Sequence, residues 1–451
     1  MANPIISPIS LVSPKPSSSG GSPSSQSAEG QRLGKFTVTS DVTFLGTSAD
    51  DGYNTAVLNF TSTPKIVAVG SDVYQVNMVS TVPLRIPEWI NSQNYPLVRS
   101  LSTGDSFSFP DDPRDFSASL DFSSDYVGMI RQSDLLQKAT VSLYARPAGG
   151  AVHDLLANPI GTGVDITAPY NAYANYGAYF TPDQKYLVVW YGQKVGETFL
   201  YVYSTGEQLV LKASYMVPAV VESMGLVIQQ IVIHKHKQDY IIAWLPTAIP
   251  LADFTPLTPD LCSLLVLGRI TTGDDEVAIV VDDQQRQPQT ALGMDISPDN
   301  RRIVVATRNG PPVVWPDTTE PLPGENVQFR IYRISTKRRN PGAYSLTYVG
   351  GEPFNLRATL PAFKPDDPTV LVLTTRVIAN GNVSLLSYTL KCDVLALHDI
   401  RTVAPTGTAL AWFDGADGKE VIVGGSELFN GAEGNTGYTP NWLCATVNTC
   451  Q

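Results

Sequence analysis

Short apolar runs separated by turn-forming residues fill most of the chain from residue 35 onward. Many of these runs are rich in β-branched and aromatic side chains, and the 3.6-residue period of an amphipathic helix is nearly absent. The stretch 291–310, ALGMDISPDNRRIVVATRNG, shows the pattern clearly. An apolar run ends at Ile296, Ser297–Asn300 give a turn signal, and a second apolar run covers Ile303–Ala306. The pattern predicts an all-β chain in which this stretch forms a hairpin.

The same phrase recurs along the chain at intervals of roughly 50 to 67 residues. The residues that end the first run of each copy are Phe60, Phe122, Phe180, Ile233, Ile296, Phe363 and Phe413. A second, continuously apolar run follows each turn: IVAVG, YVGMI, YLVVWY, YIIAWL, IVVAT, VLVLTT and VIVGG. Most units add a third, alternating run and a weaker fourth one, such as EQLVLKAS. Seven such units predict a seven-bladed β-propeller of four-stranded antiparallel blades.

The two ends of this region predict how the ring closes. The last unit weakens after VIVGG, and Leu443–Val447 is its only obvious further strand. Residues 35–46, KFTVTSDVTFLG, precede the first unit as additional strand material. We therefore expect the N-terminal strand to complete the last blade, in a propeller domain that spans residues 34–451.

Residues 1–33 form a separate tail that is rich in Pro, Ser and Gly. Such a segment has too little apolar surface to offset the entropy lost on ordering, so we expect it to be disordered unless a partner binds it. Its apolar residues are the candidates for docking: Ile5, Ile6, Ile9, Leu11 and Val12.

The phrase apolar–Phe/Ile–Ser/Thr–Pro–Asp, clearest at Tyr179–Val189 and Asp295–Val305, resembles the repeats of the seven-bladed propeller superfamily, in the style of the WD40 and TolB-like families. The resemblance covers about residues 35–450 but lacks the regular Gly-His and Trp-Asp dipeptides of WD40 repeats. The units are also longer than WD40 repeats, which implies that insertions decorate one face.

A second resemblance concerns the tail. Residues 21–32, GSPSSQSAEGQR, resemble the lead-in segment of phage tail-nozzle propeller proteins, although Leu33-Gly-Lys-Phe follows in place of an Asn-Leu-Tyr-like continuation. This resemblance implies a virion component.

Charge and hydropathy limit the partners. The net charge of −11 argues against non-specific nucleic-acid binding, which needs a basic surface. The basic cluster Lys337–Arg339 is followed by Asn-Pro-Gly, and we interpret it as a solvated turn, with a specific anionic contact as the alternative. No run reaches the ~18 apolar residues of a membrane span. The N-terminus also lacks the cationic start of a signal peptide. We expect a soluble protein, cytoplasmic or, if viral, in the virion.

The sequence contains no recognisable catalytic or metal-binding pattern. His234 and His236 alternate as ligands on a strand would, but they fall where other units have turns, so we predict a solvated turn. The Asp414–Glu420 segment lacks the closing Glu of a calcium loop at the right offset. The four cysteines include no C-x-x-C pair; we expect thiols, with a Cys444–Cys450 disulfide as the alternative. We therefore predict no catalytic residues, no metal and no cofactor.

Irregular insertions are the best candidates for function, because loops on a rigid scaffold carry recognition. Three stand out: Ile86–Pro113, Gly149–Tyr176 and Asn309–Asn326. Their candidate interaction residues are Trp89, Tyr95, Tyr170, Tyr173, Tyr176 and Trp315. Tyrosine and tryptophan are enriched in recognition surfaces. The alternative is that these rings pack the insertions onto the blades.

The leading hypothesis is a non-catalytic structural or interaction protein, a propeller subunit of a larger assembly that contacts other protein subunits through its tail and insertions. One alternative is a propeller enzyme, or a ligand- or glycan-binding protein, that uses the central funnel. Another is an intracellular WD40-like adaptor.

Overall fold

The structure is a computed structural model. It describes residues 31–33, 36–43, 65–76, 96–100, 103, 105–108, 117–133, 136–170, 174–192, 197–220, 225–249, 263–273, 276–287, 290–308, 327–337, 342–354, 357–358, 361–376, 383–391, 394–403, 409–415, 418–430 and 436–447. The described residues form antiparallel β-sheets and one short 3-10 turn, Ala148–Gly150, which confirms the predicted all-β class.

The strands group into seven sheets within the described residues, named I to VII in chain order of their first strands. Sheet I contains β3 (Lys65–Val69), β4 (Asp72–Val76), β5 (Pro96–Ser100) and β6 (Ser106–Ser108). Sheet II contains β7 (Ser117–Phe122), β8 (Tyr126–Ser133), β9 (Lys138–Ala145) and β10 (Val164–Asp165). Sheet III contains β11 (Asn175–Phe180), β12 (Tyr186–Gly192), β13 (Thr198–Ser204) and β14 (Val210–Val217). Sheet IV contains β15 (Gly225–His236), β16 (Asp239–Ile249), β17 (Ser263–Thr272) and β18 (Val277–Gln287).

The remaining sheets follow the same plan with additions at their edges. Sheet V contains β19 (Thr290–Ile296), β20 (Arg302–Arg308), β21 (Val327–Thr336) and β22 (Tyr344–Phe354). Sheet VI contains β23 (Arg357–Ala358), β24 (Ala362–Lys364), β25 (Asp367–Arg376), β26 (Val383–Lys391) and β27 (Val394–Val403). Sheet VII contains β28 (Ala409–Gly415), β29 (Gly418–Asn430), β30 (Thr436–Val447), β2 (Phe36–Thr43) and β1 (Gln31–Leu33).

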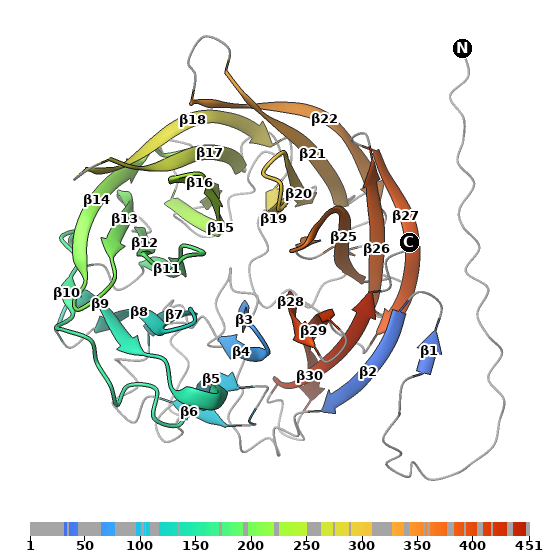
Figure 1. Cartoon of the computed structure of the whole chain (residues 1–451), viewed down its shortest axis with the longest axis horizontal. Helices are drawn as coiled ribbons and strands as arrows, with labels where there is room; N and C mark the ends of the chain where they lie inside the picture. Colours follow the sequence, from blue (N-terminus) through green and yellow to red (C-terminus); the bar gives the residue numbers. More distant parts are fainter. Residues whose placement is uncertain are drawn as a thin grey trace.

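The sheets stand around a common axis, with the first strand of each nearest the centre (Figure 1). These inner strands contact one another in a continuous series: β3 with β7, β7 with β11, β11 with β15, β15 with β19, β19 with β24, β24 with β28, and β28 with β3. This radial arrangement of antiparallel sheets is a β-propeller.

The last sheet is completed by the N-terminal part of the chain, as the sequence predicts. Strand β2 pairs antiparallel with β30, with Phe36 opposite Val447 and Thr43 opposite Asn441. Residues 31–33, the end of the predicted tail, pair with β2 as β1. The other tail residues, including Ile5, Ile6, Ile9, Leu11 and Val12, lie outside the described residues.

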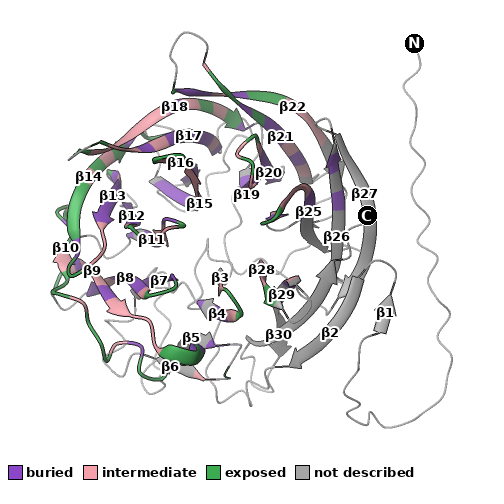
Figure 2. Cartoon of the chain, viewed as in Figure 1, coloured by how far each residue is buried: buried purple, intermediate pink, exposed green. Residues whose placement is uncertain are grey.

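The apolar core lies between neighbouring sheets, and the strands that frame it carry many buried residues (Figure 2). Separate clusters of buried side chains fill the junctions I–II, II–III, III–IV, IV–V and V–VI. The second strands of sheets II to V each contribute to two junctions, because their alternate side chains point to opposite faces. In β20, for example, Val305 packs toward sheet IV and Val304 toward sheet VI, and both are fully buried. This explains why second strands are apolar without alternation.

The repeat predicts the individual hairpins correctly except in the first unit. The opening hairpin is confirmed: β19 ends at Ile296, and the buried strand β20 contains Ile303–Ala306. In the first unit, however, IVAVG was expected as the second strand, whereas β3 is the innermost strand of sheet I and contacts β7 and β28. The expected inner residue Phe60 lies outside the described residues. Both runs in this unit are apolar, so only packing against neighbouring sheets fixes their order.

No helix of the described residues has the length and hydropathy needed to cross a membrane.

The pairing of β2 with β30 predicts a difference between two truncations. Deleting residues 1–43 should expose the β30 edge and remove a full strand of backbone hydrogen bonds, so the melting temperature should fall by several degrees and the protein should aggregate. Deleting residues 1–30 should leave the melting temperature unchanged. Thermal unfolding with size-exclusion chromatography measures both effects, and equal melting temperatures for the two truncations would contradict the role of β2.

Candidate interaction face

The two ends of the sheets differ in the connections that they carry. We define the turn face as the end at which the first and second strands of each sheet join, and the loop face as the opposite end. Short hairpins occupy the turn face; β15 and β16, for example, are joined by Lys237 and Gln238 alone. The strand ends joined by residues 77–95, 250–262 and 309–326 all lie at the loop face, because each of these segments connects a second strand to a third.

Two turns of the repeat share one hydrogen-bonding pattern. In sheet V, the Ser297 hydroxyl donates to Asp299 (2.6 Å), the Arg302 N–H donates to the Ser297 hydroxyl (3.0 Å), and Asn300 adopts a positive φ of 58°. Thr181, Asp183 and Gln184 repeat this arrangement in sheet III, with a φ of 52° at Gln184. The Asp in the Ser/Thr-Pro-Asp phrase is therefore a turn former, as the sequence predicts.

Polar groups join neighbouring sheets around the ring. The links between described residues, in order of junction, are Arg146 Nη1 to Asp72 Oδ2 (2.6 Å), Asp125 N to Gln184 Oε1 (3.0 Å), Tyr240 Oη to Asp183 Oδ1 (2.7 Å), Asn300 Nδ2 to Lys235 O (3.1 Å), Phe363 N to Asp295 Oδ2 (2.7 Å), Trp412 Nε1 to Ala362 O (3.3 Å) and Asp414 N to Gly70 O (2.8 Å). Four of these seven links involve a residue of a first hairpin turn. The turn face is thus a cross-linked layer whose polar groups bond to one another.

Asp183 is the most connected carboxylate of this layer. It accepts hydrogen bonds from Tyr240 (2.7 Å) and Thr181 (3.1 Å), and Lys235 Nζ lies 3.1 Å from Oδ2. Burial alone would raise the pKa of Asp183, but these hydrogen bonds and the charge of Lys235 hold it below its ordinary value. The same ammonium lies 3.9 Å from the centroid of the Tyr240 ring, so the two groups of sheet IV that contact Asp183 also contact each other.

Aspartates on the inner strands form a second kind of link. Asp121 on β7 accepts the N–H of Phe180 on β11 (2.7 Å), and Asp295 on β19 accepts the N–H of Phe363 on β24 (2.7 Å). Burial raises the pKa of Asp295 to about 7, although its two backbone N–H donors act in the opposite direction. Each of these aspartates directly precedes the Phe or Ile that ends the first apolar run of its unit. This shared position could have identified both residues from the sequence, but the alignment considered only the turn that follows.

Of the predicted interaction residues, Tyr170 and Tyr176 are the ones that lie within the described residues. Trp89, Tyr95, Tyr173 and Trp315 lie outside the described residues, but the strands that flank Trp89 and Trp315 end at the loop face. Tyr170 is half-buried just before β11.

The structure places Tyr176 in the core instead. Its side chain is buried in β11 and stacks on Tyr191, with ring centroids 6.3 Å apart. Residues 146–163, the first part of the second predicted insertion, lie at the turn face and pack on sheet I, where Val152 and Leu155 are fully buried. For these residues the alternative interpretation, packing onto the blades, applies.

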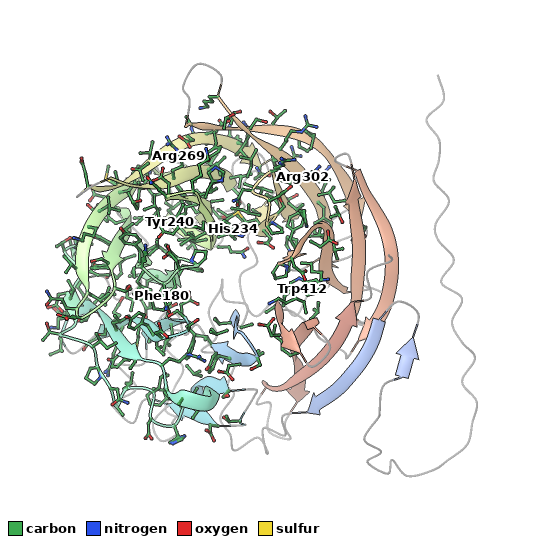
Figure 3. All side chains as sticks on the ribbon, in the orientation of Figure 1. Phe180, His234, Tyr240, Arg269, Arg302 and Trp412 are labelled. Atoms are coloured by element: carbon green, nitrogen blue, oxygen red, sulfur yellow. The ribbon has the colours of Figure 1, made fainter. Side chains whose placement is uncertain are left out.

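The two histidines of the His-Lys-His segment are not in a turn. His234 and His236 belong to β15, and the turn follows at Lys237 and Gln238. His234 Nδ1 lies 3.1 Å from Asn300 Oδ1 of sheet V, and burial lowers the pKa of His234. In Figure 3, His234, Phe180 and Trp412 lie near the axis, and Arg269 lies further out. No group of three or more potential metal ligands occurs among the described residues.

Comparisons with known proteins give weak similarities. No family model and no curated protein matches the chain. Among solved structures, it is similar to a protein of Lactobacillus plantarum (12% identity, 84% of this chain and 96% of the other, TM-score 0.45). It is also similar to the β-propeller domain of the trilobed protease from Pyrococcus furiosus (10%, 87% and 96%, 0.40) and to a polysaccharide lyase (8%, 86% and 90%, 0.46). The propeller assignment therefore rests on the strand pairing and inner-strand contacts of this chain.

The Asp183–Tyr240 hydrogen bond predicts a measurable coupling between sheets III and IV. Asp183→Asn and Tyr240→Phe should each destabilise the protein, and a double-mutant cycle should give a coupling of about 1–2 kcal/mol, because the bond is charge-assisted. Urea unfolding of the four proteins at neutral pH measures this energy. Additive effects of the two substitutions would contradict the coupling.

The raised pKa of Asp295 predicts a pH dependence of stability. Between the unfolded pKa of about 3.9 and the folded value of about 7, the folded state retains a proton that the unfolded state has lost, so stability should fall as pH rises. Asp295→Asn should flatten this dependence while lowering stability at pH 5, because one backbone N–H then loses its acceptor. Urea unfolding between pH 4 and pH 8 tests this, and parallel curves for the two proteins would refute it.

Proposed function

We propose that the protein is a non-catalytic, seven-bladed propeller that serves as a structural or interaction subunit of a larger assembly. Its loop face and its N-terminal tail contact other protein subunits. The observation that carries this proposal is the separation of the two faces: the short first-hairpin turns, which bond to one another, lie on one side, and the strand ends of the connections 77–95, 250–262 and 309–326 lie on the other.

The closed series of inner-strand contacts supports a count of seven blades. Each inner strand contacts the inner strands of two neighbouring sheets, and β28 contacts β3, so no further sheet is needed to close the ring. The repeat fits the same number, since each of sheets II to VII contains one copy of the turn phrase at or near its first hairpin.

Support for an interaction role comes from rigidity combined with variable connections. A ring whose neighbouring sheets are hydrogen-bonded at each described junction holds its loops at fixed positions, as recognition requires. Strand β1, which directly follows residues 1–30 in the sequence, lies at the outer edge of sheet VII (Figure 1), and we expect the tail to contact a neighbour from this edge. The resemblance of residues 21–32 to phage tail-nozzle proteins favours a virion as the assembly, with a cytoplasmic complex as the alternative.

The test uses tagged chains expressed in the native source, with particles isolated by density gradient. Deleting residues 1–30, or replacing residues 309–326 with a two-residue turn, should lower incorporation at least about tenfold while the melting temperature stays unchanged. As a matched control, two glycines inserted in residues 205–209 change the turn face and should leave incorporation at the wild-type level.

Two outcomes would overturn the proposal. Incorporation of both variants at the wild-type level would remove the tail and loop face as contacts. A monomer that turns over substrates from a glycan panel would favour an enzyme that uses the central funnel.

A further inference from the structure

Arg330 on β21 has only neutral partners among the described residues, unlike Arg146 and Arg269. Arg146 pairs with Asp72 at 2.6 Å, and Arg269 pairs with Asp282 through two hydrogen bonds of 2.7 and 3.0 Å. Arg330 instead donates from Nε to the Tyr332 hydroxyl (2.9 Å) and from Nη1 to Gln328 Oε1 (3.3 Å). Among the described residues, no carboxylate pairs with Arg330.

A chain of hydrogen bonds fixes the orientation of this guanidinium. The Tyr332 hydroxyl, which accepts from Arg330, donates to Gln287 Oε1 (3.1 Å), and Gln287 Nε2 donates to the Gln285 carbonyl (3.0 Å). Tyr332 and Gln287 are buried at the junction between sheets IV and V. The position of the guanidinium is therefore fixed by its hydrogen bond to Tyr332, a side chain that is held in place by burial and by its own bond to Gln287.

Tyr348 on β22 holds the other side of the guanidinium. Arg330 Cζ lies 4.2 Å from the centroid of the Tyr348 ring, which gives a cation–π contact, and 44% of Tyr348 is exposed. Gly351 is the cross-strand partner of Arg330, and a Cβ atom at this position would lie 2.4 Å from the Phe329 carbonyl oxygen and 3.1 Å from the Tyr348 hydroxyl. The close approach of the β21 backbone therefore requires glycine here, and the glycine also leaves the Tyr348 hydroxyl unobstructed.

The donors that remain match a carboxylate. With Nε bound to Tyr332 and one N–H of Nη1 directed at Gln328, Nη2 has no hydrogen-bond partner among the described residues, and the Nη1–Nη2 edge is available for bidentate recognition. A half-buried cation without a counter-ion is costly, and a partner's carboxylate would relieve that cost. Exposed Tyr and Arg together are also the residue types that dominate interface energetics.

We propose that Arg330 and Tyr348 form an anchor for a carboxylate group of a protein partner at the rim of sheet V. Arg330 lies near Val327, at the end of β21 next to the loop face, so the anchor extends the proposed interaction face and depends on the proposed function. The net charge of −11 opposes binding of a nucleic acid or another polyanion, which favours a single protein carboxylate.

The test measures binding of the full chain to an array of short peptides with a central Glu, each paired with a Gln twin. The wild-type protein should prefer Glu peptides over their twins. Arg330→Gln should abolish the preference and reduce affinity about tenfold or more, whereas Arg330→Lys should retain part of it, because charge remains but the bidentate fork is lost. Tyr348→Phe, which keeps the stacking, should bind as the wild type, and Tyr348→Ala should bind more weakly.

Other results would contradict the proposed anchor or its assignment to a carboxylate. A wild-type protein that does not distinguish Glu from Gln peptides, or an Arg330→Gln variant with wild-type binding and an unchanged melting temperature, overturns the anchor. Stronger binding of phosphopeptides or of a single-stranded oligonucleotide than of Glu peptides overturns the carboxylate assignment. If Glu peptides do not bind through Arg330 while deletion of residues 1–30 still prevents incorporation into the assembly, the anchor is wrong and the proposed function stands. If the variants that lack residues 1–30 or 309–326 also incorporate at the wild-type level, the anchor and the proposed function are both wrong.

Discussion

The propeller depends on one constraint: each sheet has two apolar faces, and only the neighbouring sheets cover them. The buried clusters lie at the junctions, so a sheet removed from the ring would expose core on both sides. Each sheet is therefore stable only while both of its neighbouring sheets are in place. The polar links at the same junctions, such as Asp183 with Tyr240 and Asp295 with Phe363, then fix the rotation of one sheet against the next.

The two faces distribute rigidity and variation differently. On the turn face, carboxylate and amide groups form hydrogen bonds with neighbouring sheets, as at Asp125, Gln184 and Asn300. The strand ends that flank the connections 77–95, 250–262 and 309–326 lie at the opposite end of the sheets from these turn contacts. Arg330 lies in the loop-face part of β21, and its hydrogen bond to the buried Tyr332 fixes its orientation.

Hairpins could be predicted from the local sequence wherever turn-forming residues separate two apolar runs that become buried strands. Ser297–Asn300 and the apolar run after it specify a hairpin by themselves, and Phe36–Thr43 is recognisable as an unpaired strand. The order of strands in sheet I was misassigned because both runs are apolar and only contacts with β7 and β28 decide it. The environment of Arg330 was not predictable, since no local pattern shows which side chains a distant strand places beside a guanidinium.

The pairing of β2 with β30 also sets an order of events during synthesis. Residues 36–43 are made long before their partner strand, which ends at Val447, so sheet VII cannot be completed until residues 436–447 have been made. Sheets I to VI can form in sequence from contiguous segments, whereas the final closure joins the most distant parts of the chain. Until then β2 is an unpaired strand with exposed backbone, and the nascent chain must be protected from pairing with the β2 or β30 of another copy.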